Sequence, residues 1–184
     1  MGAMAAKQIA EGQGLPAEAG DLARQRYRQA DAPLPVGWND TLDTIFSHRS
    51  VRAYLPDSVP AGTIETLVTA AQSAAASSNL QVWSVVAVED VDRKARLAAF
   101  AGHQKHILQA PLFLVWLLDL ARLEAIGRER GVETEALGYI ESFLLGAVDT
   151  ALAAQMLSSR WNRLGSAASI SARSAISRST SPRN

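Results

Sequence analysis

Seven consecutive apolar residues, Leu112–Leu118, constrain the fold more than any other stretch of this chain. A continuous apolar run of this length is typical of a β-strand that is buried on both of its faces. A second stretch rich in β-forming residues lies at Gln81–Val88. Helical periodicity surrounds both stretches, and this alternation predicts an α/β or α+β sandwich in which helices flank a sheet.

The predicted helices follow from apolar spacing, capping residues and breakers. We expect them at Pro16–Ala30, Thr41–Ser47, Asp57 or Ser58 to Ala75, Asp90–Phe100 and Leu120–Arg130, with a short helix between Gly102 and Pro111. A further helix, predicted at Glu133–Gln155, is apolar most of the way round. Such a helix is buried on several sides, and we place it at a subunit interface.

Composition and charge exclude several classes of protein. With 184 residues, 48% of them hydrophobic, the chain suits one domain with a sizeable core. Its 18 basic and 18 acidic residues cancel, so no basic field indicates a nucleic-acid partner. There is no Cys and only three poorly spaced His, so we expect no metal site. The longest uncharged apolar stretch, Ala110–Leu118, is far shorter than the roughly 20 residues that cross a bilayer, which predicts a soluble cytoplasmic protein without a membrane partner.

Two Arg, one His and one Ser occur within the five residues His48–Arg52, which we call the basic segment. A guanidinium donates two parallel hydrogen bonds and stays charged, so a cluster of this kind can bind a phosphate. The alternative is a solvated basic patch at a helix C-terminus, where cations complement the helix dipole. These five residues by themselves favour the alternative.

A loop of small residues at Ala76–Gln81 lets a flat ligand come close to the backbone. Plain helix termination explains the same residues equally well. No G-x-G-x-x-G motif follows a strand, and no G-x-x-x-x-G-K-[ST] motif is present. Neither a Rossmann dinucleotide site nor a P-loop is therefore expected.

Four blocks resemble the nitroreductase family in order and spacing: HRSVRAYLPDSVP, ASSNLQ, GHQKHILQAP and ESFLLGAVDTALAAQ. The resemblance covers Thr41–Gln155 and points to the NADPH-dependent, oxygen-insensitive nitroreductase and flavin reductase branch. It implies an incomplete nitroreductase-like α+β fold, with a mixed sheet flanked by helices and a long buried helix at a dimer interface. It also implies a homodimeric FMN enzyme with a ping-pong mechanism. NADPH or NADH would reduce the flavin, which would then reduce a nitroaromatic, a quinone or free flavin.

The resemblance implies ligand contacts for ten residues, none of them catalytic in itself, because the flavin carries the hydride chemistry. The FMN phosphate and ribityl chain would contact His48, Arg49, Ser50 and Arg52. The flavin ring and its phosphate side would contact Ser77, Gln104, Lys105 and His106. A stacked substrate would lie beside Ser78 and Asn79. Without the resemblance, the three residues from Gln104 to His106 are better explained as a polar helix start.

After Gln155 the chain departs from the family. Residues 156–184 hold nine Ser, five Arg and no acidic residue, whereas the family continues with a helix, a Gly-rich loop and a buried strand. Restoring one base after the Gln155 codon shifts the reading frame of everything that follows. With suitable codons this stretch then reads NAVVAVESLGLGGVYIGAIRN, which resembles the family here. We therefore expect a partly disordered extension at 1–40, a partial FMN-binding domain at 41–155 and an out-of-frame tail at 156–184. The alternative is a genuine disordered Ser/Arg-rich tail.

An out-of-frame tail would remove the later strands of the sheet and the downstream part of the FMN site. Apolar surface and strand edges would be exposed, so we expect the chain as written to be unstable and at best a weak flavin binder. Two other functions stay open. One is a non-catalytic flavin-binding or interaction remnant. The other is a nucleic-acid binder that uses the basic tail, where Trp161 is the only aromatic residue.

Overall fold

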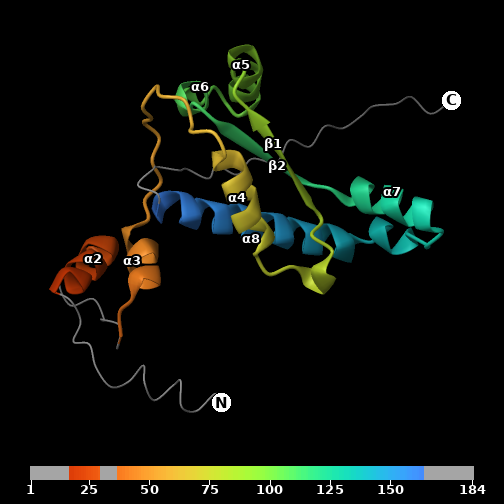
Figure 1. Ribbon diagram of the computed structural model, residues 1–184, viewed down its shortest axis with the longest axis horizontal. Coiled ribbons are helices and arrows are strands. Elements are labelled where there is room, and N and C mark those ends of the chain that lie inside the picture. The colour runs from red at the N-terminus through yellow and green to blue at the C-terminus, as the bar shows by residue number, and fades with distance from the viewer. Residues whose placement is uncertain (1–16, 30–36, 164–184) are drawn as a thin grey trace. The chain divides into compact units, whose positions relative to one another are not determined.

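The computed structural model describes residues 17–29 and 37–163 (Figure 1). The described residues fall into two compact units: one contains those up to Arg49 together with Asn162 and Arg163, and the other is formed by Ser50–Trp161. Most of the predicted extension at 1–40 and most of the predicted tail at 156–184 lie outside the described residues.

The first unit pairs two helices, α2 (Ala17–Tyr27) and α3 (Asp40–Ser47). Asn39 caps α3, because its side chain accepts a hydrogen bond from the Leu42 N–H at 3.0 Å. The ring of Phe46 meets the ring of Tyr27 edge-on, with 6.1 Å between the ring centroids. This aromatic contact holds α2 against α3.

A two-stranded antiparallel sheet runs through the second unit. Its strands β1 (Trp83–Val88) and β2 (Phe113–Leu118) pair end to end and match the two predicted strands. The prediction that Leu112–Leu118 is buried on both faces is wrong in this chain, because β2 is only partly buried and Leu117 is 43% exposed. Among the described residues β2 pairs with β1 alone, so its second edge stays uncovered.

Helices make up the rest of the second unit. They are α4 (Thr63–Gln72), α5 (Val91–Phe100), α6 (Lys105–Gln109), α7 (Leu120–Arg130) and α8 (Ile140–Arg163), with the 3₁₀ turns η1 (Ser77–Asn79) and η2 (Glu135–Gly138). The predicted ends of α5 and α7 are confirmed. Asp90 caps α5 by accepting the Arg93 N–H at 2.8 Å, and Gly131 ends α7 with a left-handed φ of 65°.

α4 and α8 differ most from the prediction in their bounds. α4 begins at Thr63 rather than at Asp57 or Ser58, because the chain first makes a turn that Gly62 closes with a φ of 80°. The helix predicted at Glu133–Gln155 is divided by the extended backbone of Tyr139, so α8 begins at Ile140. It then continues past Gln155 to Arg163.

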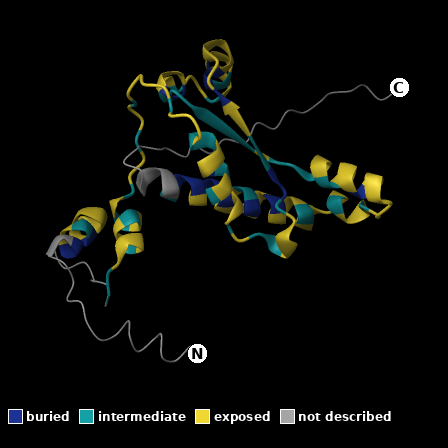
Figure 2. Ribbon diagram, in the orientation of Figure 1, coloured by how far each residue is buried: buried dark blue, intermediate teal, exposed yellow. Residues whose placement is uncertain are grey.

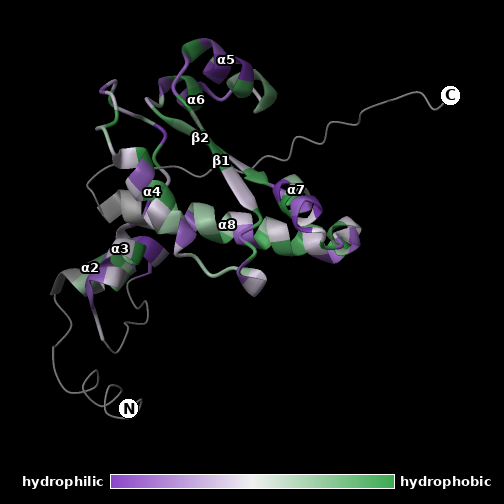
Figure 3. Ribbon diagram, turned by 45° about the vertical axis from the view of Figure 1, so that its right-hand side comes forward, coloured by the Kyte–Doolittle hydropathy of each residue, from purple (hydrophilic) through white to green (hydrophobic). Residues whose placement is uncertain are grey.

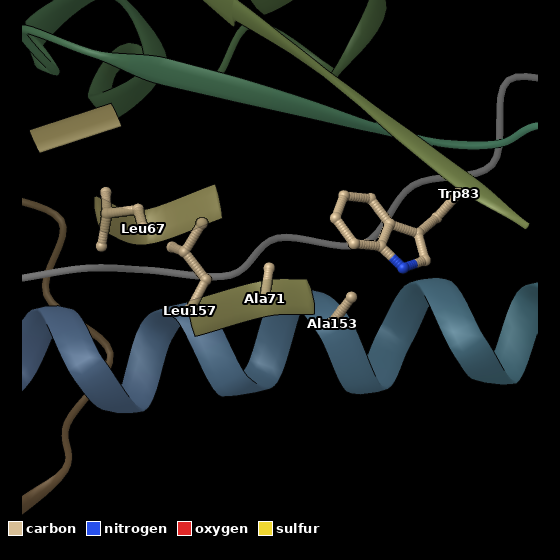
Figure 4. Close-up of a cluster of buried hydrophobic side chains, with 5 residues drawn as sticks. All are labelled: Leu67, Ala71, Trp83, Ala153 and Leu157. Carbon is tan, nitrogen blue, oxygen red and sulfur yellow. The ribbon is translucent and has the colours of Figure 1, made fainter. Parts of the chain in front are cut away.

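The core lies where α4, β1 and α8 meet. Figure 4 shows its buried side chains pointing toward one another; they are Leu67, Ala71, Trp83, Ala153 and Leu157. α8 also packs closely on β2, because a Cβ added at Gly146 would lie 2.8 Å from Cγ of Leu118. This packing fixes one side of α8 on the sheet.

The other side of α8 carries an exposed apolar ridge, which consists of Ile140, Leu144, Val148 and Leu152 at a spacing of four residues. Figures 2 and 3 show exposed and hydrophobic residues along this helix. Ile140–Ser159 is also apolar and long enough to cross a membrane, but many core helices of soluble proteins meet this criterion as well. The single chain therefore covers one side of α8 and leaves the ridge without a cover among the described residues.

Candidate functional site

The basic segment begins at the C-terminus of α3. His48 is the C-cap of this helix, and the Arg49 guanidinium turns back toward it. Nη1 of Arg49 donates to the backbone oxygen of Phe46 at 2.7 Å and to that of His48 at 2.8 Å. These bonds satisfy carbonyl groups that a helix leaves unpaired at its end. In this chain Arg49 therefore acts as a helix cap, as the alternative interpretation of the basic segment predicts.

The four predicted phosphate contacts of the basic segment do not belong to one unit. His48 and Arg49 lie in the first unit, whereas Ser50 and Arg52 lie in the second and are exposed. A second Arg also reaches His48, because Nη1 of Arg26 donates to its backbone oxygen at 2.5 Å. The backbone at the start of the basic segment is thus held by arginines of the first unit.

The predicted loop follows α4. We call Ser77–Gln81 the serine loop. Ser78 and Asn79 are exposed and have left-handed φ values of 52° and 53°, and Gln81 has a φ of 47°. A left-handed conformation is costly for residues other than glycine and persists only where surrounding contacts hold it. The serine loop is therefore a defined turn, rather than a simple continuation of the end of α4.

A buried carboxylate holds the first residue of the serine loop. The Ser77 backbone N–H donates to Oδ1 of Asp149 at 3.1 Å. Asp149 lies on α8 and is only 4% exposed, and its Oδ2 is buried without a hydrogen-bond partner. Asp149 was not among the predicted site residues, although a single acidic residue inside the apolar run FLLGAVDTALAAQ was a usable signal.

Arg122 of α7 holds the other end of the serine loop. Its Nη2 donates to the backbone oxygen of Gln81 and, at 3.4 Å, to that of Trp83. Gln81 also donates through Nε2 to the backbone oxygen of Gln72 at 3.3 Å. The sequence places Arg122 in the predicted helix Leu120–Arg130 and gives no reason to link it to the loop.

The carboxylate of Asp119 stabilises the start of α7 beside this contact. It accepts the Ser84 hydroxyl at 2.5 Å and the Arg122 backbone N–H at 3.0 Å. The hydrogen bond from Ser84, then that from the Arg122 N–H, and last the nearby Arg122 charge lower the pKa of Asp119. Partial burial opposes this shift but is the weaker effect.

The third group of predicted contacts begins α6. Gln104 occupies the N-cap position and is half-buried, Lys105 is exposed and His106 is half-buried. Ile107, 2% exposed, anchors this short helix, which packs against α5. Lys94 of α5 fixes the end of α6, because its Nζ donates to the backbone oxygen of Ala110 at 2.8 Å. The structure thus presents the three polar residues consecutively on one well-anchored helix start.

Comparison with known proteins identifies the fold family of these segments. Residues 45–114 match the family model described as Nitroreductase family. This segment is similar to the nitroreductase family. All ten predicted ligand contacts lie within the matched nitroreductase segment, whereas Arg122 and Asp149 lie beyond it.

Several nitroreductase relatives are similar to this chain over about three fifths of its length or more. The FMN reductase (NADPH) of Bacillus subtilis is 37% identical over 121 residues, which are 65% of this chain and 49% of the relative. The oxygen-insensitive NADPH nitroreductase of Salmonella typhimurium is 34% identical over 115 residues, which are 62% of this chain and 46% of the relative. The chain therefore spans about half the length of the curated relatives it matches.

A solved structure supports the same fold assignment. The NADPH:FMN oxidoreductase from Vibrio harveyi, complexed with NAD+, superposes with a TM-score of 0.63 at 34% identity. The match covers 69% of this chain and 53% of that structure. The α+β fold predicted from the sequence is thus confirmed as an incomplete nitroreductase fold.

Proposed function

We propose that this chain is part of an FMN-dependent oxidoreductase that transfers hydride from NADPH or NADH to nitroaromatics, quinones or free flavin by a ping-pong mechanism. The observation that carries the proposal is the coincidence of the nitroreductase match at 45–114 with all ten predicted ligand contacts. Relatives named FMN reductase (NADPH) and oxygen-insensitive NADPH nitroreductase support this reaction class.

The residues present suit an anionic, planar cofactor such as FMN. Arg49, Arg52 and Lys105 take part in no ion pair within the described ranges, so their charges are not neutralised there by a neighbouring carboxylate. Both helix-capping bonds of Arg49 use Nη1, and its Nη2 and Nε are the atoms that would bind a phosphate. The small exposed side chains of Ser78 and Asn79 leave room for a flat ring.

When bound, FMN would supply the hydride chemistry. The protein would bind and orient it. The basic segment would neutralise the phosphate, and Gln104 and Lys105 would donate hydrogen bonds toward the ring, where a donor or a cation stabilises developing negative charge. The serine loop would set the distance between the backbone and the ring.

The apolar ridge of α8 supports a homodimer. Its residues are spaced by four, which gives one continuous stripe along the helix. We expect a second copy of the chain to cover this stripe, as the sequence analysis predicts for this helix. Val148→Glu would place a charge in the middle of the ridge and should shift the chain to a monomer in analytical ultracentrifugation. An unchanged dimer would contradict this interface.

The reading-frame hypothesis remains part of the proposal, and one buried atom supports it. Oγ of Ser158 is buried without a hydrogen-bond partner on the inner side of α8. The shifted frame places Val at position 158, which removes the unpaired hydroxyl, and Ala at position 157, which stays apolar. Independent DNA reads across the Gln155 codon test the hypothesis. An unbroken natural frame through Asn184 would contradict it.

The visible absorption spectrum tests the proposed function. The full chain is mixed with FMN and desalted, and the shifted-frame chain is treated in parallel. We expect retained flavin in the shifted-frame chain and little in the chain as written, because the chain as written matches only about half of the relatives' length. Arg52→Ala should reduce retention in whichever chain holds flavin. Arg96→Ala, an exposed change outside the proposed site, is the matched control.

The second candidate function is a flavin-binding or interaction remnant without catalysis. The half-length match and the uncovered edge of β2 favour it for the chain as written. NADPH oxidation with a nitroaromatic or quinone acceptor separates the two candidates. Turnover in the shifted-frame chain alone would assign the activity to that chain. Failure of both chains to retain flavin would contradict both candidates.

A further inference from the structure

Asp149 is an unusual residue for the inner side of α8. Its neighbours on that side, among them Gly146 and Ala153, are small or apolar, yet its carboxylate is 4% exposed. Burying a carboxylate costs free energy unless hydrogen bonds compensate for the lost water. The only hydrogen bond described for this side chain is the one from the Ser77 N–H, 72 positions away in the sequence. The carboxylate is therefore placed for this contact rather than for the stability of its own helix.

The hydrogen bond between Ser77 and Asp149 lies directly before the left-handed residues of the serine loop. Ser77 directly precedes Ser78 and Asn79, whose left-handed backbones turn the chain back toward β1. Left-handed backbone at non-glycine residues relaxes readily when its anchors are lost. Side chains of two other helices hold the serine loop, Asp149 of α8 at its start and Arg122 of α7 at its end. Loss of the hydrogen bond to Asp149 would allow Ser78 and Asn79 to leave their left-handed conformations.

We propose that Asp149 is a positioning residue that holds the serine loop in the conformation that receives the flavin ring and its stacked substrate. The inference rests on the proposed function for the identity of the ligand. Asp149 acts through the Ser77 backbone and not through the Ser77 side chain. The bond fixes the start of the turn, the turn fixes Ser78 and Asn79, and these two exposed residues define the face offered to a planar ligand.

The variants differ in whether they keep an acceptor for the Ser77 N–H. Asp149→Asn keeps an oxygen that can accept the Ser77 N–H, so it preserves the anchor while removing the charge. Asp149→Ala removes the acceptor and leaves the Ser77 N–H without it. Ser77→Ala leaves the backbone bond in place. Thr150→Ala is the matched control on the same turn of α8, because its hydroxyl donates only within the helix, to the backbone oxygen of Gly146 at 2.7 Å.

Hydrogen–deuterium exchange of the full chain without FMN measures the anchor directly. In Asp149→Ala the amides of Ser77–Gln81 should exchange about tenfold faster, because the variant loses one hydrogen bond to a charged group. Asp149→Asn, Ser77→Ala and Thr150→Ala should stay within about twofold of the parent chain in this loop. Exchange in β1 reports whether the variant is folded.

FMN affinity, measured by flavin fluorescence in the chain that retains flavin, provides the second readout. Asp149→Ala should weaken FMN binding by about tenfold, and Asp149→Asn should restore it to within about threefold. Unchanged exchange in the serine loop of a folded Asp149→Ala chain would overturn the proposal. A loosened loop with unchanged FMN affinity would also overturn it.

Failure of the proposed function would look different from failure of this inference. A parent chain that binds no FMN in either reading frame contradicts the proposed function before any variant is compared. The exchange experiment needs no flavin and would still decide whether Asp149 holds the loop. Should Asp149→Ala fail to fold, the pair Asp149→Asn and Asp149→Ser provides the comparison. Asp149→Ser has a shorter side chain that cannot reach Ser77 in the same way, and it should loosen the loop.

Discussion

The basic segment and the serine loop are both proposed ligand contacts, yet the chain holds them by different kinds of contact. Arg49 bonds to backbone oxygens one and three residues away, at the end of its own helix. The serine loop bonds to Asp149 and Arg122, which lie 72 and 41 positions away from their partners. The basic segment therefore has the more recognisable phosphate-binding motif. The serine loop is held by contacts with residues that are distant in the sequence.

The two regions therefore depend on the tertiary structure to different degrees. Contacts between residues close in sequence form whenever their helix forms, and they need no particular partner element. Contacts across the core form only when α7, α8 and the sheet pack together, so they report directly on tertiary structure. The serine loop should thus be the more sensitive of the two regions to damage in the core.

The largest expected effect comes from the core under the serine loop. Trp83→Ala removes a buried ring that packs with Trp116 at a centroid distance of 5.3 Å. We expect a loss of about 3–5 kcal/mol in the free energy of unfolding of the second unit. Urea unfolding followed by near-ultraviolet circular dichroism measures it. The aromatic contacts of α2 and α3 should persist, and their simultaneous loss would contradict independent anchoring of the two regions.

Arg122→Ala should have a smaller effect, because the side chain is largely exposed. It removes the bonds to the Gln81 and Trp83 backbone oxygens and should cost about 1 kcal/mol of stability. Amide exchange should rise at Gln81 more than at Ser77. Arg128→Ala on the same helix breaks only an exposed ion pair with Glu124 and is the control. Equal effects of the two changes would show that Arg122 does not anchor the loop.

Arg49→Ala tests the basic segment in the same way. The loss of its helix-capping bonds should cost about 0.5 kcal/mol of stability, because the guanidinium is exposed. FMN retention should fall by about tenfold, since a charge-assisted phosphate contact is lost. Thermal unfolding and flavin fluorescence measure the two effects. A large loss of stability without a loss of FMN binding would reverse the roles assigned to the two regions.

The smallest expected effect is on the free energy of unfolding at low pH, and it involves Asp119 at the start of α7. The pKa of Asp119 is lowered in the folded chain, chiefly by the Ser84 hydroxyl, so its carboxylate stabilises the fold above its ordinary value of 3.8. This contribution is lost as the pH falls through the lowered pKa. Ser84→Ala should therefore destabilise the chain more at about pH 6 than at about pH 3, as measured by urea unfolding. A pH-independent difference would contradict this assignment.

Local patterns in the sequence were sufficient for most of the secondary structure. Asn39 and Asp90 cap the predicted helices α3 and α5, and α7 occupies the predicted residues Leu120–Arg130. These features depend on residues within a few positions of one another, so the sequence displays them directly. The resemblance to the nitroreductase family was likewise visible in four ordered motifs and is confirmed by the comparisons.

The tertiary structure decided the features that join distant residues. Only packing shows that Asp149 and Arg122 hold the two ends of one loop, or that the core covers one side of α8 and leaves its apolar ridge uncovered. The sequence left two interpretations of Arg49 open, and the geometry places it at the end of α3. The physical reason is the same in each case. Periodicity and caps specify local backbone, whereas the partner of a buried carboxylate depends on which elements the core brings together.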